Sequence, residues 1–307
     1  MLGDVIISEK KKADLKKSSV RALERKGAGA KEREAKSRKQ RAVSIKQTFK
    51  NIPIVIAIVI VSLALASGCG GSAKSTSTKN ISSKPINVAA ASSFQTAFQN
   101  LAQGFTDETG IKIDFNFGSS GLLARQIEEG APVDIYASAS KKYVSDLKKQ
   151  GLISTEKSVT VSGQLVLIFS EFTEKSLFDL VSTDIEKIAI ANPEHAPYGE
   201  AAKKVLKNAG LWDSVKDKIV YGNNIVQTTQ FVSSKNADAG LISISHAAAS
   251  GFEFEVIDKD LYDPIEQPIV IVEESTNKDA AAKFISYLSE GEGRQKLGAY
   301  GFKVDDE

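Results

Sequence analysis

Four short segments of the chain place small or hydroxyl-bearing residues where a predicted strand passes into a predicted helix. They are Ala-Ser-Ser at 91–93, Gly-Ser-Ser-Gly at 118–121, Ala-Pro-Tyr-Gly at 196–199 and Gly-Asn-Asn-Ile at 222–225, and none contains Lys or Arg. A helix that begins there leaves backbone N–H groups without carbonyl partners, and its N-terminus favours negative charge. Amides and hydroxyls without a cation suit a fully ionised oxyanion, which accepts hydrogen bonds and offers none.

These residues also have a plain structural explanation, because Ser and Asn are good N-caps of helices. For any single junction this is the commoner explanation, and four such junctions in one chain weaken it without removing it. Ligands of open α/β sheets usually bind at the carboxyl ends of the strands. We therefore expect the four junctions to meet at one site.

The chain lacks the common motifs of nucleotide-binding proteins, zinc proteases and serine hydrolases, namely GxxxxGK[ST], GxGxxG, HExxH and GxSxG. Its single cysteine, Cys69, excludes an internal disulfide and a cysteine-based metal site. Two histidines, His195 and His246, leave little for histidine-centred catalysis. We expect no catalytic residues, no cofactor and no direct metal ligands; a hydrolase that pairs a Ser with one histidine is a remote alternative.

Predicted strands and helices alternate from residue 86 to residue 303, with glycines closing several helices. This rhythm predicts an α/β fold with mainly parallel sheets flanked by helices. The predicted strands are 86–91, 112–117, 133–137, 164–170, 187–191, 219–221, 239–244, 254–257 and 269–272. The predicted helices are 94–109, 122–129, 141–150, 177–181, 199–209, 225–233, 278–289 and 293–300.

The basic character of the chain belongs to its first 50 residues. They hold 16 Lys and Arg against 6 Asp and Glu, whereas the remaining 257 residues carry a net charge of −8. The whole-chain excess of +2 is therefore no argument for nucleic-acid binding. We expect segment 1–50 to be disordered, because it has few large apolar residues to bury. It is a basic cytoplasmic tail, an oversized signal n-region, or sequence upstream of the true start.

Segment 51–69 has the features of a signal-peptide core followed by a lipoprotein processing box. An apolar run at 52–66 is interrupted only by Pro53 and Ser62, and it ends in Ala-Ser-Gly directly before Cys69. The run is short for a membrane-spanning helix. Segment 70–85 is small and polar, which is typical of a flexible tether. These features predict that a lipid on Cys69 anchors the protein to the outer face of the cell membrane.

Several longer stretches resemble the periplasmic molybdate-binding protein family (ModA type). They are 88–94 (VAAASSF), 117–139 (FGSSGLLARQIEEGAPVDIYASA), 191–199 (ANPEHAPYG) and 300–302 (YGF). The resemblance covers residues 86–303. It implies a two-lobed type II periplasmic-binding-protein fold with the ligand cleft between the lobes. Lobe one would comprise 86–163 and 267–307, and lobe two would comprise 164–266.

The resemblance also implies which residues hold the ligand. Ser93 and Ser120 match the family's ligand serines of lobe one, and the backbone N–H groups of Tyr198 and Ile225 match its donors in lobe two. Many members add a fifth contact, a tyrosine hydroxyl, at the position that Ser243 occupies in this chain. Because this chain lacks that tyrosine, the fifth contact is in doubt. We expect Ser92 or the Tyr198 hydroxyl to supply the missing donor.

The function implied is capture of molybdate, and of tungstate, for an ABC importer. Its partners would be a permease and an ATPase, and the binding protein itself is expected to be a monomer. The alternatives are a receptor for another tetrahedral oxyanion, such as sulfate or phosphate, and an interaction module whose basic tail contacts a membrane or nucleic acid. Cavity size would disfavour sulfate. Phosphate keeps a proton at neutral pH, and the four junctions offer it no carboxylate acceptor.

Overall fold

The computed structural model describes residues 84–171 and 175–304, which belong to one compact unit, Ser77–Glu307. Segments 1–50 and 51–69, the proposed lipidation site Cys69 and nearly all of tether 70–85 lie outside the described residues. Among the described residues, no helix is both long enough and apolar enough to cross a membrane.

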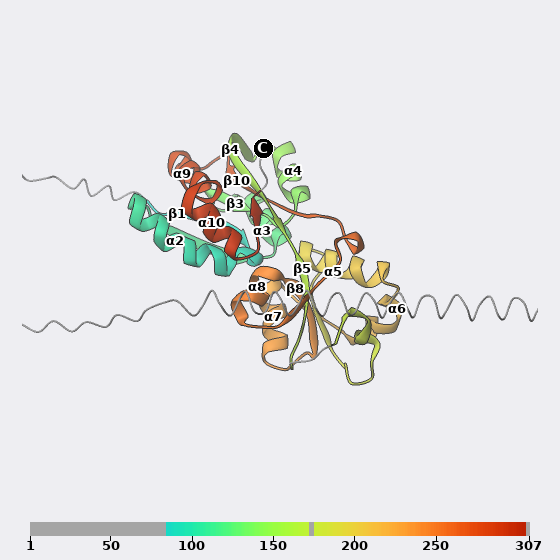
Figure 1. Cartoon of the computed structure of the whole chain (residues 1–307). Coiled ribbons are helices and arrows are strands. Elements are labelled where there is room, and N and C mark those ends of the chain that lie inside the picture. Colours follow the sequence, from blue (N-terminus) through green and yellow to red (C-terminus); the bar gives the residue numbers. More distant parts are fainter. Residues whose placement is uncertain (1–83, 172–174, 305–307) are drawn as a thin grey trace, which may run out of the picture. The chain divides into compact units, whose positions relative to one another are not determined.

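The first lobe is built on a six-stranded sheet with the order β11-β4-β10-β3-β1-β2 (Figure 1). Its alternating buried strands and amphipathic helices follow the pattern of an α/β fold. Its strands are β1 (Ile86–Ala91), β2 (Ile113–Gly118), β3 (Ile135–Ala137), β4 (Ile153–Gly163), β10 (Ile265–Val272) and β11 (Lys303–Val304). Its helices are η1 (Ser92–Phe94), α2 (Gln95–Thr109), α3 (Ser120–Glu128), α4 (Lys141–Lys149), α9 (Lys278–Ser289) and α10 (Gly291–Ala299).

The second lobe is built on a five-stranded sheet with the order β7-β6-β8-β5-β9. Its strands are β5 (Leu165–Phe169), β6 (Ile188–Ala191), β7 (Ile219–Gly222), β8 (Ala239–Ser243) and β9 (Phe254–Val256). Its helices are η2 (Leu177–Val181), α5 (Pro197–Asn208), α6 (Trp212–Val215), η3 (Lys216–Lys218), α7 (Ile225–Ser233), α8 (Ile244–Ser250) and η4 (Lys259–Leu261).

Both sheets are mixed, which corrects the prediction of mainly parallel sheets. Strand β1 runs parallel to β2 and β3, and β6 runs parallel to β7 and β8. The strands next to the lobe crossings run the other way: β10 is antiparallel to β3 and β4, and β5 is antiparallel to β8 and β9. The parallel pairs come from strand–helix–strand units, whereas the crossing strands reverse direction because they join one sheet to the other.

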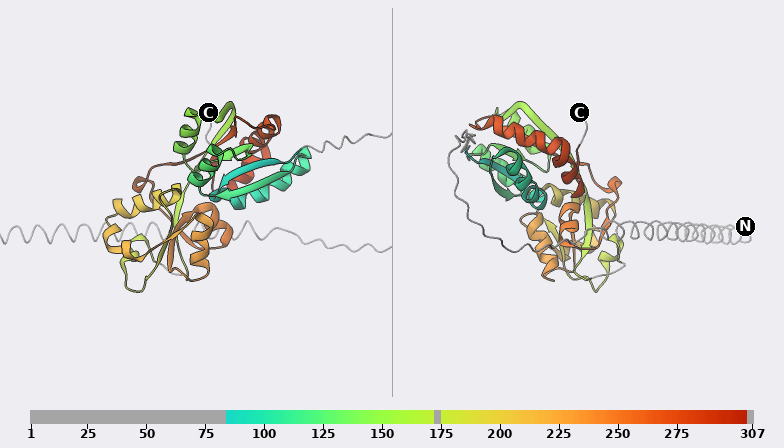
Figure 2. Two further views of the ribbon diagram at one scale, coloured as in Figure 1. Left: turned by 180° about the vertical axis from the view of Figure 1, so that it is seen from behind. Right: turned by 60° about the vertical axis from the view of Figure 1, so that its left-hand side comes forward.

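The chain passes between the two sheets twice. It leaves the first sheet at the end of β4, enters the second through β5, and returns after β9 to β10 (Figure 2). Gln267 on β10 pairs with Val161 on β4, so the two crossings are hydrogen-bonded neighbours close to the lobe boundary. Such paired strands are the kind of element that flexes in a hinge.

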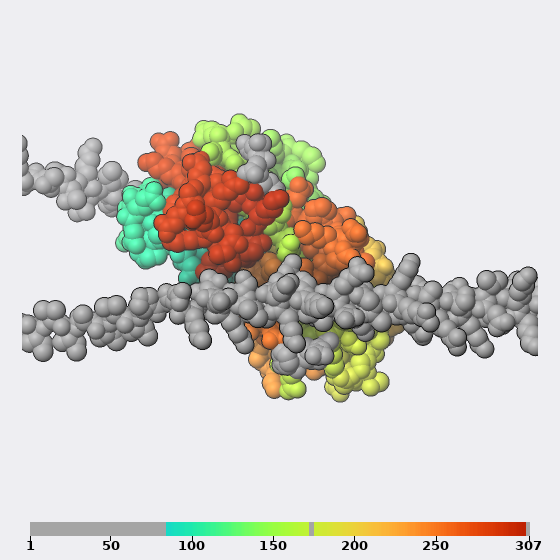
Figure 3. Space-filling view, in the orientation of Figure 1, coloured from blue at the N-terminus to red at the C-terminus, as the bar shows by residue number. Residues whose placement is uncertain are grey.

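An aromatic stack fixes the first junction of lobe one. Phe94, which directly follows the two serines, stacks on Phe98 with a centroid distance of 4.7 Å and on Phe302 with a distance of 5.0 Å. Phe302 belongs to the C-terminal residues that cover part of lobe one (red in Figure 3). The end of the chain therefore supports the start of α2, because stacked rings resist displacement of the backbone between them.

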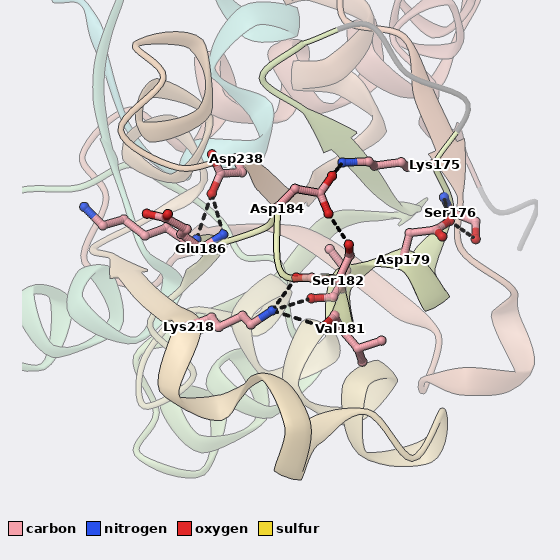
Figure 4. Close-up of polar contacts among 11 residues, drawn as sticks. Lys175, Ser176, Asp179, Val181, Ser182, Asp184, Glu186, Lys218 and Asp238 are labelled. Carbon is pink, nitrogen blue, oxygen red and sulfur yellow. Dashed lines mark hydrogen bonds and ion pairs between the residues drawn. The ribbon is translucent and has the colours of Figure 1, made fainter.

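Polar contacts hold the described part of the connection between β5 and β6 (Figure 4). The Lys218 ammonium donates to the carbonyls of Leu180, Val181 and Ser182, at 3.3, 3.3 and 2.7 Å. Asp184 contacts Lys175 and Ser182 nearby. The lysine satisfies carbonyls at the end of η2 that have no partner within that short helix.

Asp134 forms a buried polar network in lobe one. One carboxylate oxygen accepts from the Asn87 amide at 2.8 Å, and the other accepts from the Ser275 hydroxyl at 2.6 Å. The side chain of Asn277 adds a contact at 3.3 Å. Asp134 thus ties β1 to the segment after β10, which agrees with a structural role and leaves it outside the ligand site.

His246 of α8 is buried in lobe two, where its Nδ1 atom lies 3.3 Å from the Ser243 hydroxyl. Burial lowers the pKa of His246 from about 6.5 to about 4, because a buried imidazole loses the hydration of its charged form. Below about pH 6.5 the unfolded chain takes up a proton that the folded chain does not. His246 therefore lowers the free energy of unfolding as the pH falls from about 6.5 toward about 4.

We expect the free energy of unfolding of His246→Gln to fall less steeply between about pH 6.5 and about pH 4. The difference from the original chain should reach up to about 3 kcal/mol at the acidic end. The measurement is urea unfolding of both proteins at several pH values between about 7.5 and about 4.5. Ser145→Ala, at an exposed position on α4, is the control and should keep the fall of the original chain. Parallel curves for His246→Gln and the original chain would contradict the assignment.

Candidate functional site

A small cavity lies where the four junctions meet. It has about 210 Å³ of empty space including its mouth. The lining residues are Ala91, Ser92, Ser93, Gly118, Ser119, Ser120, Ala139, Ala196, Pro197, Tyr198, Asn224 and Ile225.

The helices that begin at the cavity are mostly not capped by side chains. No side-chain cap is present at Ala91, Ser119 or Ala196, and only Asn224 caps its helix, by accepting from the Gln227 amide at 3.1 Å. The plain N-cap explanation therefore accounts for one junction of the four. At α3 and α5, the N–H groups of Ser120 and Tyr198 have no carbonyl partner within their helices and are available to a ligand, whereas the Gly121 N–H donates to the His195 carbonyl at 3.0 Å.

Two serine hydroxyls of lobe one accept a hydrogen bond and keep their own proton. Ser120 accepts from the Ala139 amide at 2.9 Å. Ser92 accepts from the Ile225 amide of lobe two at 3.1 Å. Both serines are buried and line the cavity. Because a hydroxyl that accepts can still donate, each has a proton to offer to an anion.

Tyr198 contributes its backbone rather than its hydroxyl to the cavity. It is the second residue of α5, so its N–H has no carbonyl partner within the helix. The fully buried hydroxyl lies against Gly163 and Gln267 at the lobe crossing and has no hydrogen-bond partner in the part of the chain that the structure describes. Burial raises the pKa of the Tyr198 hydroxyl, which stays protonated. Of the two expected replacements for the missing donor, this placement favours Ser92.

The other two predicted residues behave differently. The Ser93 hydroxyl lines the cavity, but it donates to the Gln267 side-chain oxygen at 2.9 Å. Ser243 is not among the lining residues, and its hydroxyl contacts Ser245 at 3.0 Å and His246 at 3.3 Å. The structure thus brings Ser92, Ser93, Ser120, Tyr198 and Ile225 together and leaves Ser243 aside.

Contacts across the cleft include residues that the sequence did not single out. His195 of lobe two places Nδ1 2.8 Å from the Ser119 hydroxyl, and its carbonyl accepts from the Gly121 amide at 3.0 Å. Ser245 donates to the Ser93 carbonyl at 2.8 Å. In the sequence, the single local signal for this role is that His195 directly precedes the 196–199 junction.

The cavity is electrically neutral apart from its oriented dipoles. None of its lining residues is Lys, Arg, Asp or Glu. Arg125, which follows the 118–121 junction within α3, is exposed and makes no ion pair with any residue in 84–171 or 175–304. Those residues also contain no group of three or more His, Cys, Asp or Glu able to hold a metal ion. The geometry supports binding of a small, fully ionised oxyanion by hydrogen bonds alone.

Comparison with known proteins agrees with this geometry. The family described as bacterial extracellular solute-binding protein matches residues 86–303. The molybdate-binding protein ModA of Azotobacter vinelandii is 31% identical over 71% of this chain and 89% of its own length. This chain belongs to that family, as a ModA-type member. The resemblance noted from sequence, and the two-lobed α/β fold that it implied, are confirmed.

Further proteins are similar to this chain in sequence or in fold. The putative ABC transporter substrate-binding lipoprotein YvgL of Bacillus subtilis is 32% identical, over 84% of this chain and its entire length. The solved structure of the Azotobacter vinelandii periplasmic molybdate-binding protein superposes with a TM-score of 0.69 at 29% identity, covering 72% of this chain and all of that chain. A sulfate-binding protein of Mycobacterium tuberculosis, 13% identical with a TM-score of 0.61, shares the fold.

Gly121 of lobe one lies next to His195 of lobe two, whose carbonyl accepts from the Gly121 amide at 3.0 Å. A Cβ atom there would lie 2.8 Å from the Tyr143 hydroxyl and 3.1 Å from Cβ of His195. We expect Gly121→Ala to weaken the contact between the lobes by about 1–3 kcal/mol through overpacking. Small-angle X-ray scattering should then show a larger share of conformations with separated lobes.

Gly298→Ala is the matched control, because a Cβ atom at this helical position would meet nothing within 4 Å. Its scattering curve should match that of the original chain. Identical curves for Gly121→Ala and Gly298→Ala would show that the close approach at Gly121 has no influence on closure.

Proposed function

We propose that this protein captures molybdate, and also tungstate, outside the cytoplasm and delivers it to an ABC importer. Its partners in this role are a permease and an ATPase. The ModA-type relatives support the ligand, since those of Azotobacter vinelandii and Escherichia coli are molybdate-binding proteins. The family's role is solute binding, and no cofactor or chemical step is part of the proposal.

The observation that carries the proposal is the set of hydrogen-bond donors around an uncharged cavity. The protons of Ser92 and Ser120 and the backbone N–H groups at the starts of α3 and α5 all come from its lining. Hydrogen bonds to a charged group contribute about 1.5–3 kcal/mol each. Five to seven of them would support sub-micromolar affinity after the cost of closure is subtracted.

Selectivity follows from the same lining. No carboxylate is present to accept the proton that phosphate keeps at neutral pH, so that anion would leave a donor unpaired. Sulfate is fully ionised but smaller than molybdate, and it would sit too far from donors held on rigid helix starts. Molybdate and tungstate are nearly equal in size, so both should bind.

The Ser119–His195 pair at the cleft is a feature that a hydrolase would share. A catalytic histidine needs a third group that orients its second ring nitrogen. Within residues 84–171 and 175–304, no hydrogen bond to Nε2 of His195 is present. Because the pair spans the two lobes, its role in the proposal is to hold the cleft closed over the ligand.

Calorimetric titration of the fragment Ser77–Glu307 with molybdate, tungstate, sulfate and phosphate at neutral pH tests the ligand. We expect one-to-one binding of molybdate and tungstate with a Kd below about 1 μM, and no heat from the other two. Tight binding of sulfate or phosphate would keep the fold and overturn the ligand. Silence from all four would overturn the proposed function.

Serine variants test whether this cavity is the binding site. Ser120→Ala and Ser92→Ala should each weaken molybdate binding about 10-fold or more, because each removes a hydrogen bond to a charged group. Ser145→Ala is the control: this serine is exposed on α4, outside the cavity. Equal affinities for all three variants would place the ligand elsewhere.

Anchoring through a lipid on Cys69 is the second part of the proposal. Its support is the apolar run that ends just before Cys69 and the fact that the relative in Bacillus subtilis is a putative lipoprotein. A lipid and a short tether would keep the binding lobes near the permease at the membrane surface.

Cys69→Ser should release the protein from the membrane fraction into the medium, because acylation requires the thiol. Fractionation of cells producing either chain, followed by intact mass of the purified proteins, measures this directly. Membrane retention of Cys69→Ser to the same extent as the original chain would overturn the lipid anchor. Molybdate titration of the two chains should give the same Kd.

A further inference from the structure

The Ser93 hydroxyl points its proton away from the ligand. A serine hydroxyl has one proton, and here it is donated to Oε1 of Gln267 at 2.9 Å. In that arrangement Ser93 presents only lone pairs to the cavity, and an oxyanion would meet an acceptor where it needs a donor. Ser93 is 1% exposed and Gln267 is fully buried, so water does not offer an alternative partner to either group.

Two buried polar atoms that have no hydrogen-bond partner within residues 84–171 and 175–304 lie beside this hydrogen bond. They are the Tyr198 hydroxyl and Nε2 of Gln267. A Cβ atom placed on Gly163 would lie 2.2 Å from the tyrosine oxygen and 2.5 Å from Nε2, so both atoms crowd the same glycine. Buried polar groups normally have partners, and this pair calls for an explanation.

Rotation of the Gln267 amide by half a turn exchanges its oxygen and nitrogen without changing its shape. In the reversed orientation, the Tyr198 hydroxyl donates to Oε1 and Nε2 donates to the Ser93 oxygen. The Ser93 proton is then released toward the cavity. One rotation places the Oε1 acceptor beside the Tyr198 hydroxyl, gives Nε2 a partner in Ser93, and converts Ser93 from an acceptor into a donor for the ligand.

We propose that Gln267 is a positioning residue that sets the direction of the Ser93 hydroxyl, through a hydrogen-bond relay Tyr198–Gln267–Ser93–oxyanion. This inference rests on the proposed function. The relay begins on α5 of lobe two, passes through β10 at the lobe crossing and ends at a ligand serine of lobe one. It is complete only when lobe two holds Tyr198 against Gly163, so it couples closure of the lobes to the donor character of the site.

The relay also sets a specificity. With Gln267 donating to it, Ser93 directs its proton to the ligand, so the site favours an oxyanion that needs donors over one that retains a proton. A Gln267 that only fills space at the crossing would have no such effect on which way Ser93 points. The two roles therefore predict different responses to substitution.

Three substitutions, made in the Ser77–Glu307 fragment and titrated with molybdate, separate these roles. Gln267→Glu should lower affinity about 100-fold or more at neutral pH, because a carboxylate accepts the Ser93 proton and repels the anion. Gln267→Met should lower it only about 3- to 10-fold, since Ser93 is then free to rotate. Tyr198→Phe removes the first donor of the relay and should have an effect similar to Gln267→Met.

If Gln267 had a purely structural role, its substitution by Glu would not change how the affinity for molybdate depends on pH. The affinity of Gln267→Glu, relative to the original chain, should recover as the pH falls from about 8 to about 5.5, because a protonated carboxyl can donate to Ser93. Gln164→Glu is the matched control. It adds the same charge beside Gly163, but its side chain is outside the relay, and its relative affinity should not change with pH in this way.

A double variant keeps the inference testable if Gln267→Glu does not fold. Tyr198→Phe and Gln267→Met act through the same hydroxyl, so the double variant should bind about as well as Gln267→Met alone. Multiplied losses in the double variant, or no loss in either single variant, would overturn the relay. Failure of the original chain to bind molybdate would overturn the proposed function, and the relay with it.

Discussion

Unpaired backbone N–H groups at helix starts, buried in a cavity without a cation, are the constraint on which the site depends. Such donors are costly to bury unless a partner satisfies them. The small residues of the junctions follow from this, because the helix starts must come close to one another and to the strands behind them. At Gly199, for example, a Cβ atom would lie 2.0 Å from the Ala191 carbonyl oxygen, so no larger residue keeps α5 at its place on β6.

The two lobes are joined across the cleft by neutral hydrogen bonds. Ser92 accepts from the Ile225 amide, and Ser119 contacts His195. Neutral bonds of this kind contribute only about 0.5–1.5 kcal/mol each, so closure is easily reversed. A ligand that binds groups of both lobes then shifts the equilibrium between open and closed lobes toward the closed arrangement, because it makes more contacts there. Release to a permease needs such a shallow balance.

Local sequence signals predicted the junctions and most strands and helices, but not the parts that depend on distant partners. Segment 152–163 received no assignment, yet it forms the eleven-residue strand β4, whose hydroxyl and charged residues have little apolar periodicity. Its strand conformation comes from pairing with β10 and β11. The role of Gln267 could not be predicted from the sequence either. A lone glutamine in a strand has no local signature, and its partner Ser93 lies 174 residues away in the chain.

The charge distribution explains why recognition must act at short range. Residues 51–307 carry a net charge of −8, so the folded body does not attract an anion as a whole. Over distances beyond about 10 Å this repulsion is screened at ordinary ionic strength. Inside the cavity, oriented amides and hydroxyls replace the ligand's water without any mobile counter-charge. A lysine at the site would strengthen the binding of every anion alike. Donors fixed in position favour an ion that is small, rigid and fully deprotonated.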